Sequence, residues 1–180
     1  MVTASERAEQ RGERAEHARD IAAGVPDPEL PMLTLSDLGV LRGIEVEQDG
    51  TVVVRLTPTY SGCPAMAEMR AEVATRLRTA GFPDVRVVTV LDPPWTTDWI
   101  TAEARRKLVE HGIAPPGARR PADSAPTRIW LSLTPDPAAV PCPRCASIDT
   151  EELSRFAATA CTALRRCRAC LEPFPHVKDL

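Results

Sequence analysis

The chain has 180 residues, of which 43% are apolar and 26% are charged, and its formal net charge is −3. This composition is typical of one globular domain with a modest appendix, and it argues against a disordered chain. The near balance of charges argues against a nucleic-acid-binding protein, because such proteins neutralise phosphates with an excess of basic residues. No segment approaches the roughly eighteen continuous apolar residues of a membrane span, so we expect no membrane contact.

Residues 1–24 form a polar leader. Their charges alternate without an apolar stripe, so the sequence predicts a solvated helix or a disordered segment. The leader also lacks the apolar region of a secretory signal. We therefore expect a cytoplasmic protein whose cysteines are reduced.

The next segment, residues 25–39, is rich in turn signals. Asp27 followed by Pro28 is typical of a helix N-cap with proline at the first helical position. Pro31 would interrupt a regular helix soon afterwards. We therefore expect short turns here rather than one long helix.

Strands and helices alternate after these turns. Two β-rich runs flank Asp49-Gly50, a dipeptide that favours a type I′ hairpin turn. A strand over 85–91 and a helix over 101–112 follow a helix over 64–80 whose apolar face carries Met66, Met69, Val73 and Leu77. The order α-β-β-α-β-α predicts an α+β domain with two layers, one of sheet and one of helices.

The composition changes after this domain, which we place at 25–116. Residues 117–140 are rich in proline and hold one short apolar run, so they are predicted to be a linker with a short strand. Five of the six cysteines follow in residues 141–180. Four of them form two Cys-X-X-Cys pairs, with twenty-one residues between the pairs: Cys142, Cys145, Cys167 and Cys170. This spacing is typical of a zinc ribbon, in which four thiolates hold one ion.

Structural zinc is the metal that a closed four-cysteine site favours, although four thiolates also suit iron or an iron–sulfur cluster. A segment of about forty residues buries too little apolar surface to fold alone, so the metal would supply its stability. Disulfides are the weaker alternative in a reducing compartment. Cys161 is expected to be a small buried hydrophobe rather than a ligand.

The sixth cysteine, Cys63, lies apart at the predicted turn between a strand and a helix. At a helix N-terminus the backbone amides and the helix dipole stabilise an anion, so we expect a lowered thiol pKa. Thr57 and Thr59 offer nearby hydroxyls that could support a thiolate, a metal or a small ligand. A plain N-cap or a buried filler is the alternative for Cys63.

No catalytic set accompanies this cysteine. None of the three histidines is placed by the sequence to act as its base, so an enzyme acting alone is not expected. Trp95 and Trp99 lie in an aromatic turn after the third predicted strand. They could anchor a partner or a pocket, or they could cap the core.

Several motifs together resemble the PaaD family of the phenylacetyl-CoA epoxidase system: DPELPMLTLSDLG, TPTYSGCPAM, LDPPWTTDW, GIAPP, CPRCAS, TACTALRRC and CLEPF. The resemblance covers about residues 25–178. The first domain is also similar to a wider family of iron–sulfur cluster assembly factors, which includes SufT. Typical marks of that family are a short Asp-Pro-Glu segment and a Cys-Pro pair, here Asp27-Pro28-Glu29 and Cys63-Pro64.

The resemblance implies a non-catalytic accessory protein of aerobic phenylacetate degradation. It would assist metal or iron–sulfur maturation of an epoxidase, with the di-iron oxygenase or the reductase subunit as partner. Cys63 would hold iron or a cluster transiently, with Asp27 and Glu29 as supporting residues beside the two threonines. A structural adaptor is the second interpretation, an iron-tetrathiolate electron carrier is the third, and homo-oligomerisation stays open. The chain departs from the family's frequent Phe-Lys-Cys ending at Asp179, which argues against a second metal site built on Cys161.

Overall fold

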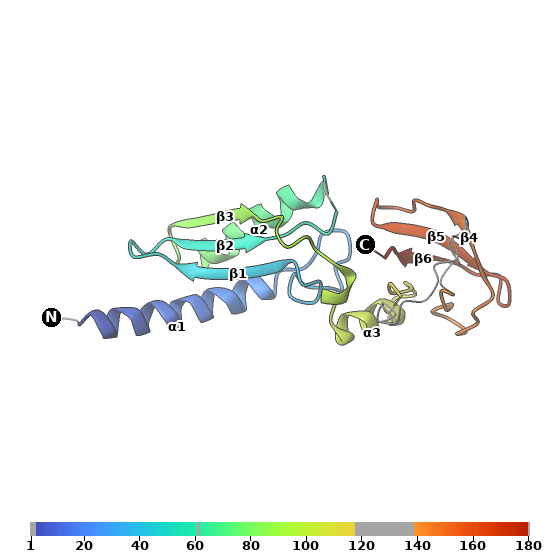
Figure 1. The fold of residues 1–180 in the computed structure, drawn as a ribbon, viewed down its shortest axis with the longest axis horizontal. Coiled ribbons are helices and arrows are strands. Elements are labelled where there is room, and N and C mark those ends of the chain that lie inside the picture. Colours follow the sequence, from blue (N-terminus) through green and yellow to red (C-terminus); the bar gives the residue numbers. More distant parts are fainter. Residues whose placement is uncertain (1–2, 61, 118–138, 180) are drawn as a thin grey trace, which may run out of the picture. The chain divides into compact units, whose positions relative to one another are not determined.

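The structure is a computed structural model that describes residues 3–60, 62–117 and 139–179. The chain forms two compact units, with the boundary in the sequence between residues 107 and 108 (Figure 1). Most of the predicted linker, residues 118–138 with its short strand, lies outside the described residues. Among the helices that are described, none combines the length and the apolar character that a membrane span requires.

A three-stranded sheet forms one layer of the N-terminal unit, with β2 between β1 and β3 (Figure 1). β1 (Leu41–Val46) and β2 (Val52–Leu56) are antiparallel, whereas β2 and β3 (Val85–Thr89) are parallel. A parallel pair needs a crossover connection, which α2 (Ala65–Thr79) supplies. The predicted α+β architecture with a β-β-α-β core is confirmed.

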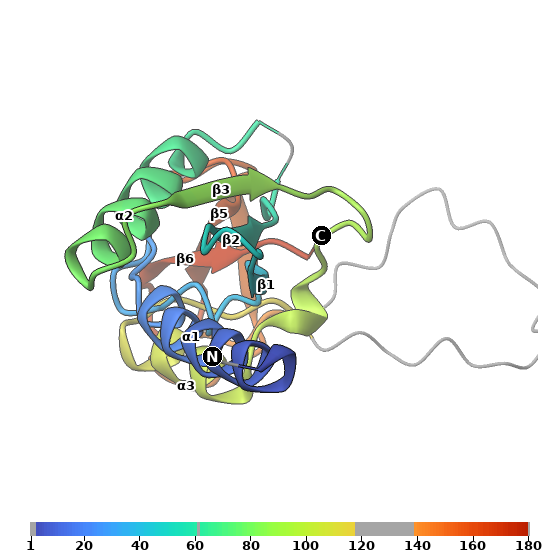
Figure 2. The same cartoon turned by 90° about the vertical axis from the view of Figure 1, so that its left-hand side faces the viewer.

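Two helices form the second layer. α1 (Ala4–Ala23) packs against β1 and α2, and α2 packs against α1 and β3, so both helices cover the same face of the sheet (Figure 2). The predicted apolar face of α2 is confirmed, except that Ala65 takes the buried place expected for Met66. The buried residues of this helix are Ala65, Met69, Val73 and Leu77.

The leader is a helix, which is one of the two alternatives that the sequence predicts; it is mostly exposed, but its second half packs against the domain instead of standing free in solvent. Thr3 and Glu6 form a reciprocal capping box at its start. Ala18 and Ala22 are completely buried, and the ring of His17 lies 5.7 Å from that of Phe82. The helix docks through small alanines, which allow close packing without the large apolar side chains that a periodicity search detects.

The β1–β2 hairpin is closed by a turn that differs from the predicted type I′ turn. The amide of Gly50 donates to the carbonyl of Glu47 at 3.1 Å, and Gly50 has a φ of +90° while Asp49 keeps a negative φ. This is a type I turn followed by a left-handed glycine. The left-handed conformation that a type I′ turn imposes on Asp49 costs a non-glycine residue about 1–2 kcal/mol. The Asp49 carboxylate instead accepts from the amide of Thr51 at 3.0 Å.

The chain after β3 caps the core at the edge of the sheet where β2 and β3 end. Buried Trp95 donates its Nε1 hydrogen to the carbonyl of Leu38 at 2.8 Å, so it caps the core. The short helix η1 (Thr97–Trp99) follows, and Gly39 packs directly against it. In α3 (Ala102–Glu110) the predicted N-cap is confirmed, because the Thr101 hydroxyl accepts from the amide of Ala104 at 3.0 Å.

The C-terminal unit is a ribbon of three antiparallel strands with β5 in the middle. The strands are β4 (Thr150–Ser154), β5 (Thr162–Cys167) and β6 (Pro173–Val177). Ala114 extends this unit by pairing with β6 beside His176. Its small core has two cysteines among its members: Ala114, Val140, Cys142, Cys167 and Phe174.

Candidate functional site

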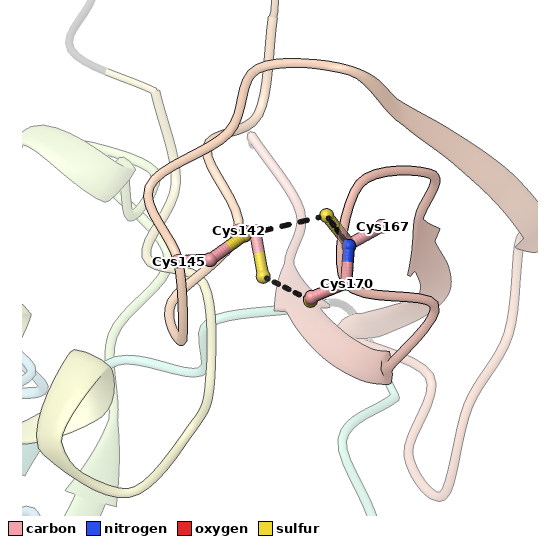
Figure 3. A group of neighbouring side chains, drawn as sticks. All are labelled: Cys142, Cys145, Cys167 and Cys170. Atoms are coloured by element: carbon pink, nitrogen blue, oxygen red, sulfur yellow. Dashed lines mark hydrogen bonds between the residues drawn. The ribbon is translucent and has the colours of Figure 1, made fainter.

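Two chain turns bring the four predicted metal-binding cysteines together in the C-terminal unit (Figure 3). Their sulfur atoms all lie within 4.8 Å of one another. Cys142 and Cys170 are 3.7 Å apart, and Cys145 and Cys167 are 3.5 Å apart, measured between Sγ atoms. A tetrahedral zinc site with Zn–S bonds of about 2.3 Å has sulfur atoms separated by about 3.8 Å. The four thiols therefore fit one tetrahedrally bound ion.

The short distances between the four sulfur atoms distinguish a site for a single ion from a site for an iron–sulfur cluster. An iron–sulfur cluster places several iron atoms and bridging sulfides between its cysteine ligands, which spreads the thiolates apart. Sulfur atoms that all lie within 4.8 Å of one another leave room for one ion. This geometry suits zinc or a single iron and does not suit a cluster.

The two turns that carry these cysteines share one backbone feature, a residue with a positive φ at the same position. Ala146 and Leu171 each lie four residues after the first cysteine of a pair, and both adopt a left-handed conformation, with φ values of 60° and 64°. The backbone amides of Cys170 and Ala169, together with the thiols of Cys145 and Cys170, lower the pKa of the Cys167 thiol, against the opposing effect of burial. One thiol is therefore prepared as a thiolate, the form that binds a metal ion.

Cys161 lies outside this group. It is half-buried in the turn before β5, rather than buried on a strand as predicted, and its sulfur lies 3.1 Å from the hydroxyl of Thr159. It can therefore serve as a control thiol in the ribbon.

The second candidate site lies at one edge of the N-terminal sheet. The loop that carries Cys63 follows the end of β2, and the 26–39 turns lead into the start of β1. Because Leu41 of β1 pairs with Leu56 of β2, these two segments meet at the same edge. The topology thus brings together two motifs that lie far apart in the sequence.

Asp27 and Glu29 accompany Cys63 at this edge. The Asp27 carboxylate is buried and accepts hydrogen bonds from the amides of Glu29 and Leu30, at 2.9 and 2.7 Å. These bonds fix the turn, as the predicted capping role of Asp27 requires. Both carboxylates lie close enough to Cys63 for their charges to act on its thiol.

The pKa of the Cys63 thiol is raised, which is opposite to the sequence-based prediction. Burial is the largest cause, and the charges of Glu29 and Asp27 raise the pKa further. The amides of Ala65 and Met66 at the helix start do lower it, as predicted. The prediction is wrong in sign because two carboxylates from a distant segment and the loss of solvent exceed this local effect.

The remaining predicted residues, Thr57 and Thr59, differ in their surroundings. Thr57 is 1% exposed, and its Oγ1 has no hydrogen-bond partner among the described residues. Thr59 is half-buried in the loop before Cys63. No contact between either hydroxyl and Cys63 is established within the described part of the chain, so their supporting role stays a prediction.

Glu68 also lies at this edge of the sheet, and it was not among the site residues predicted from the sequence. It lies in the first turn of α2, and its charge raises the pKa of Asp27, although less than burial does. It also lines a pocket of about 250 Å³ beside Pro28 and Met69. Its place in the first helical turn after Cys63 is the sequence signal that could have identified it.

Comparisons with known proteins define the class of each unit. Residues 19–91 match a family model described as an iron–sulfur cluster assembly protein, and residues 131–178 match the PaaD zinc beta ribbon domain. A solved structure of a domain of unknown function, DUF59, from Bacillus anthracis superposes with a TM-score of 0.52 at 24% identity. It covers 56% of this chain and 96% of its own, so it shows the fold of the N-terminal unit. The chain thus joins an iron–sulfur-assembly-type domain to a zinc ribbon.

Two named relatives narrow this class further. A protein of Escherichia coli (strain K12), named as a subunit of 1,2-phenylacetyl-CoA epoxidase, is 45% identical over 154 residues, which are 86% of each chain. The Fe-S protein maturation auxiliary factor SufT of Staphylococcus aureus (strain USA300) is 33% identical over 85 residues, 47% of this chain and 96% of that protein. The chain therefore belongs to the PaaD family of phenylacetyl-CoA epoxidase subunits, which confirms the resemblance seen in its motifs.

Proposed function

We propose that this protein is a non-catalytic cytoplasmic factor that matures a metal centre of phenylacetyl-CoA epoxidase. Its relatives support an accessory role in phenylacetate degradation, because one is named as an epoxidase subunit and the others as maturation factors. The other epoxidase subunits, the di-iron oxygenase or the reductase, would be its partners.

The observation that carries this proposal is that the topology brings the Cys63 loop and the turn with Asp27 and Glu29 to one edge of the sheet, near enough for both carboxylate charges to act on the thiol. The thiol offers the sulfur donor that iron–sulfur clusters use, whereas among the described residues it does not form a close ligand group with the two carboxylates, as the four ribbon cysteines do with one another. A metal ion must displace the proton of the thiol when it binds, and a raised thiol pKa makes this displacement less favourable. Weak, reversible binding of this kind suits a cargo that must be passed on.

The four-cysteine group would have a different task. We propose that it holds a structural zinc, because a closed tetrahedral thiolate site has no open position for a substrate or a transfer partner. The zinc would stabilise the ribbon while the Cys63 edge handles the iron or the cluster.

The test is the iron content and the activity of the oxygenase subunits produced with and without this chain. We expect iron-poor, inactive oxygenase in its absence, with restoration by the wild type and not by Cys63→Ala. Cys161→Ser removes another thiol outside the four-cysteine group and should restore fully. Fully loaded and active oxygenase in the absence of the chain would contradict maturation.

A structural adaptor is the second candidate, and the surface of the ribbon favours it. Four large apolar side chains are exposed there by 48–70%: Ile148, Leu153, Phe156 and Leu171. Stable stoichiometric co-purification with the oxygenase, unchanged by Cys63→Ala, would support this role. The third candidate, an electron carrier, requires iron in the ribbon, and the visible absorption of an iron tetrathiolate would reveal it.

A further inference from the structure

A cavity of about 350 Å³ lies on one face of the ribbon sheet. In the strand register Ala163 faces His176, and Glu152 faces Arg165, so all four side chains point to that face. The cavity is part of the C-terminal unit alone, and neither the four cysteines nor Cys63 line it.

Two buried nitrogen atoms in this cavity have no hydrogen-bond partner among the described residues. They are Nε of Arg165 and Nε2 of His176, on side chains that are only 8% and 7% exposed. The rest of the guanidinium group is held in place, because one terminal nitrogen donates to the Thr150 hydroxyl at 3.3 Å and the other lies 3.8 Å from Glu152. Burying an unpaired polar group is unfavourable. Arg165 Nε–H is a donor, and His176 Nε2 is a second donor in the tautomer that carries its proton there, so the pair points to a ligand that accepts hydrogen bonds.

The charges around the cavity indicate the charge of that ligand. Arg155, Arg165 and Lys178 are cationic, and Glu152 and Asp179 are anionic, which leaves one net positive charge. Burial lowers the pKa of His176, so this ring adds no charge at neutral pH. A single excess positive charge suits a monoanion better than a doubly charged phosphate.

The apolar part of the lining indicates the body of the ligand. Val140 and Ala163 are buried beside the two nitrogen atoms, and the ring of Phe156 lies at the rim with the Lys178 ammonium group 4.1 Å from its centre. The other lining residues are charged or polar, so these three side chains form one apolar patch in a mostly polar cavity, which suits a ligand with a small apolar body.

We propose that this cavity binds a small organic monocarboxylate, whose carboxylate accepts hydrogen bonds from Arg165 and His176 and whose apolar part packs against Val140 and Phe156. The binding would give the ribbon a ligand-sensing role beyond its metal site. It does not depend on the proposed role of Cys63.

The test uses the full, zinc-loaded chain labelled with ¹⁵N, with benzoate as the probe and the Arg165 Nε–H resonance as the direct reporter. Benzoate should shift this resonance saturably. Benzamide has the same ring without the charge, and it should bind about tenfold more weakly or worse, because a hydrogen bond to a charged group is the stronger one. Equal binding of benzoate and benzamide, or a shift with inorganic phosphate alone, would overturn the proposal.

Two variants separate binding from folding. Arg165→Gln removes the main donor, and Ala163→Leu fills the cavity while every polar group is kept; both should abolish the benzoate response. Arg166→Gln is the matched control, because exposed Arg166 pairs with Glu151 on the opposite face of β5. If Ala163→Leu keeps its zinc and a folded spectrum and still binds benzoate with wild-type affinity, the ligand does not occupy this cavity and the proposal fails.

Discussion

Replacing Gly39 by alanine tests how the sheet edge that carries Cys63 is held. Gly39 has a φ of +68°, and a Cβ atom there would lie 2.6 Å from the Cβ and 2.9 Å from the carbonyl oxygen of Trp99. The left-handed conformation costs alanine about 1–2 kcal/mol. Relieving the overlap against backbone atoms costs about 1–3 kcal/mol more. We therefore expect Gly39→Ala to destabilise the N-terminal unit by about 2–5 kcal/mol.

Gly50→Ala is the matched control for this substitution. Gly50 also has a positive φ, of +90°, but no atom lies within 4 Å of the position that its Cβ would occupy. It should lose only the conformational part, about 1–2 kcal/mol. Urea unfolding followed by circular dichroism at the helix band reports on the N-terminal unit, because α1 and α2 lie within it. Equal destabilisation by the two substitutions would refute the role given to the contact with Trp99.

Three further predictions concern the metal, the lone thiol and pH. Removing the metal with a chelator, or by Cys167→Ser, should cost the ribbon on the order of 10 kcal/mol and expose β5 to hydrogen exchange, whereas Cys161→Ser should retain stoichiometric metal. Glu29→Gln removes a charge that raises the pKa of Cys63, so iodoacetamide should alkylate Cys63 faster at pH 7.5. The folded-state pKa of Asp37 is lowered, so its contribution to stability should be present at neutral pH and lost as the pH falls below about 4; in urea unfolding, Asp37→Asn should flatten this part of the pH profile.

Each of these predictions has its own control. If the ribbon stays folded after its metal has been removed completely, its apolar core alone is enough to stabilise it. For the thiol, Glu72→Gln removes a carboxylate paired with Arg76 on α2, and it should leave the alkylation rate unchanged. For Asp37, burial opposes the lowered pKa, and hydrogen bonds from Lys107 and from the backbone of Thr34 outweigh it. Lys107→Gln should therefore reproduce part of the loss at neutral pH.

Local signals account for the parts of the fold that the sequence predicts. The apolar spacing in α2 and the Thr101 cap of α3 are properties of neighbouring residues, and both are confirmed. The prediction fails where distant or small residues decide. Ala18 and Ala22 are too small to mark α1 as a packed helix, yet their size is what allows it to pack closely.

The candidate sites could also be predicted only where neighbouring residues determine the structure. The spacing of the four ribbon cysteines predicts their meeting, because each pair is held by one short turn. The turns themselves use Ala146 and Leu171 at positive φ, where glycine would have been the readable signal. The sign of the Cys63 pKa shift was out of reach, since it depends on the burial of the thiol and on carboxylates that only the topology brings near.

The β1–β2 hairpin has a practical consequence for experiments. Its tip precedes β2 and the Cys63 loop follows β2, so the five residues of this strand separate them by about 16 Å at 3.3 Å per residue. Gln48 and Asp49 at the tip are exposed, which makes this turn a tolerant place for an inserted affinity peptide. Protein immobilised through the tip would hold its Cys63 edge outward, so the capture of each epoxidase component could be timed on a sensor surface without blocking the thiol.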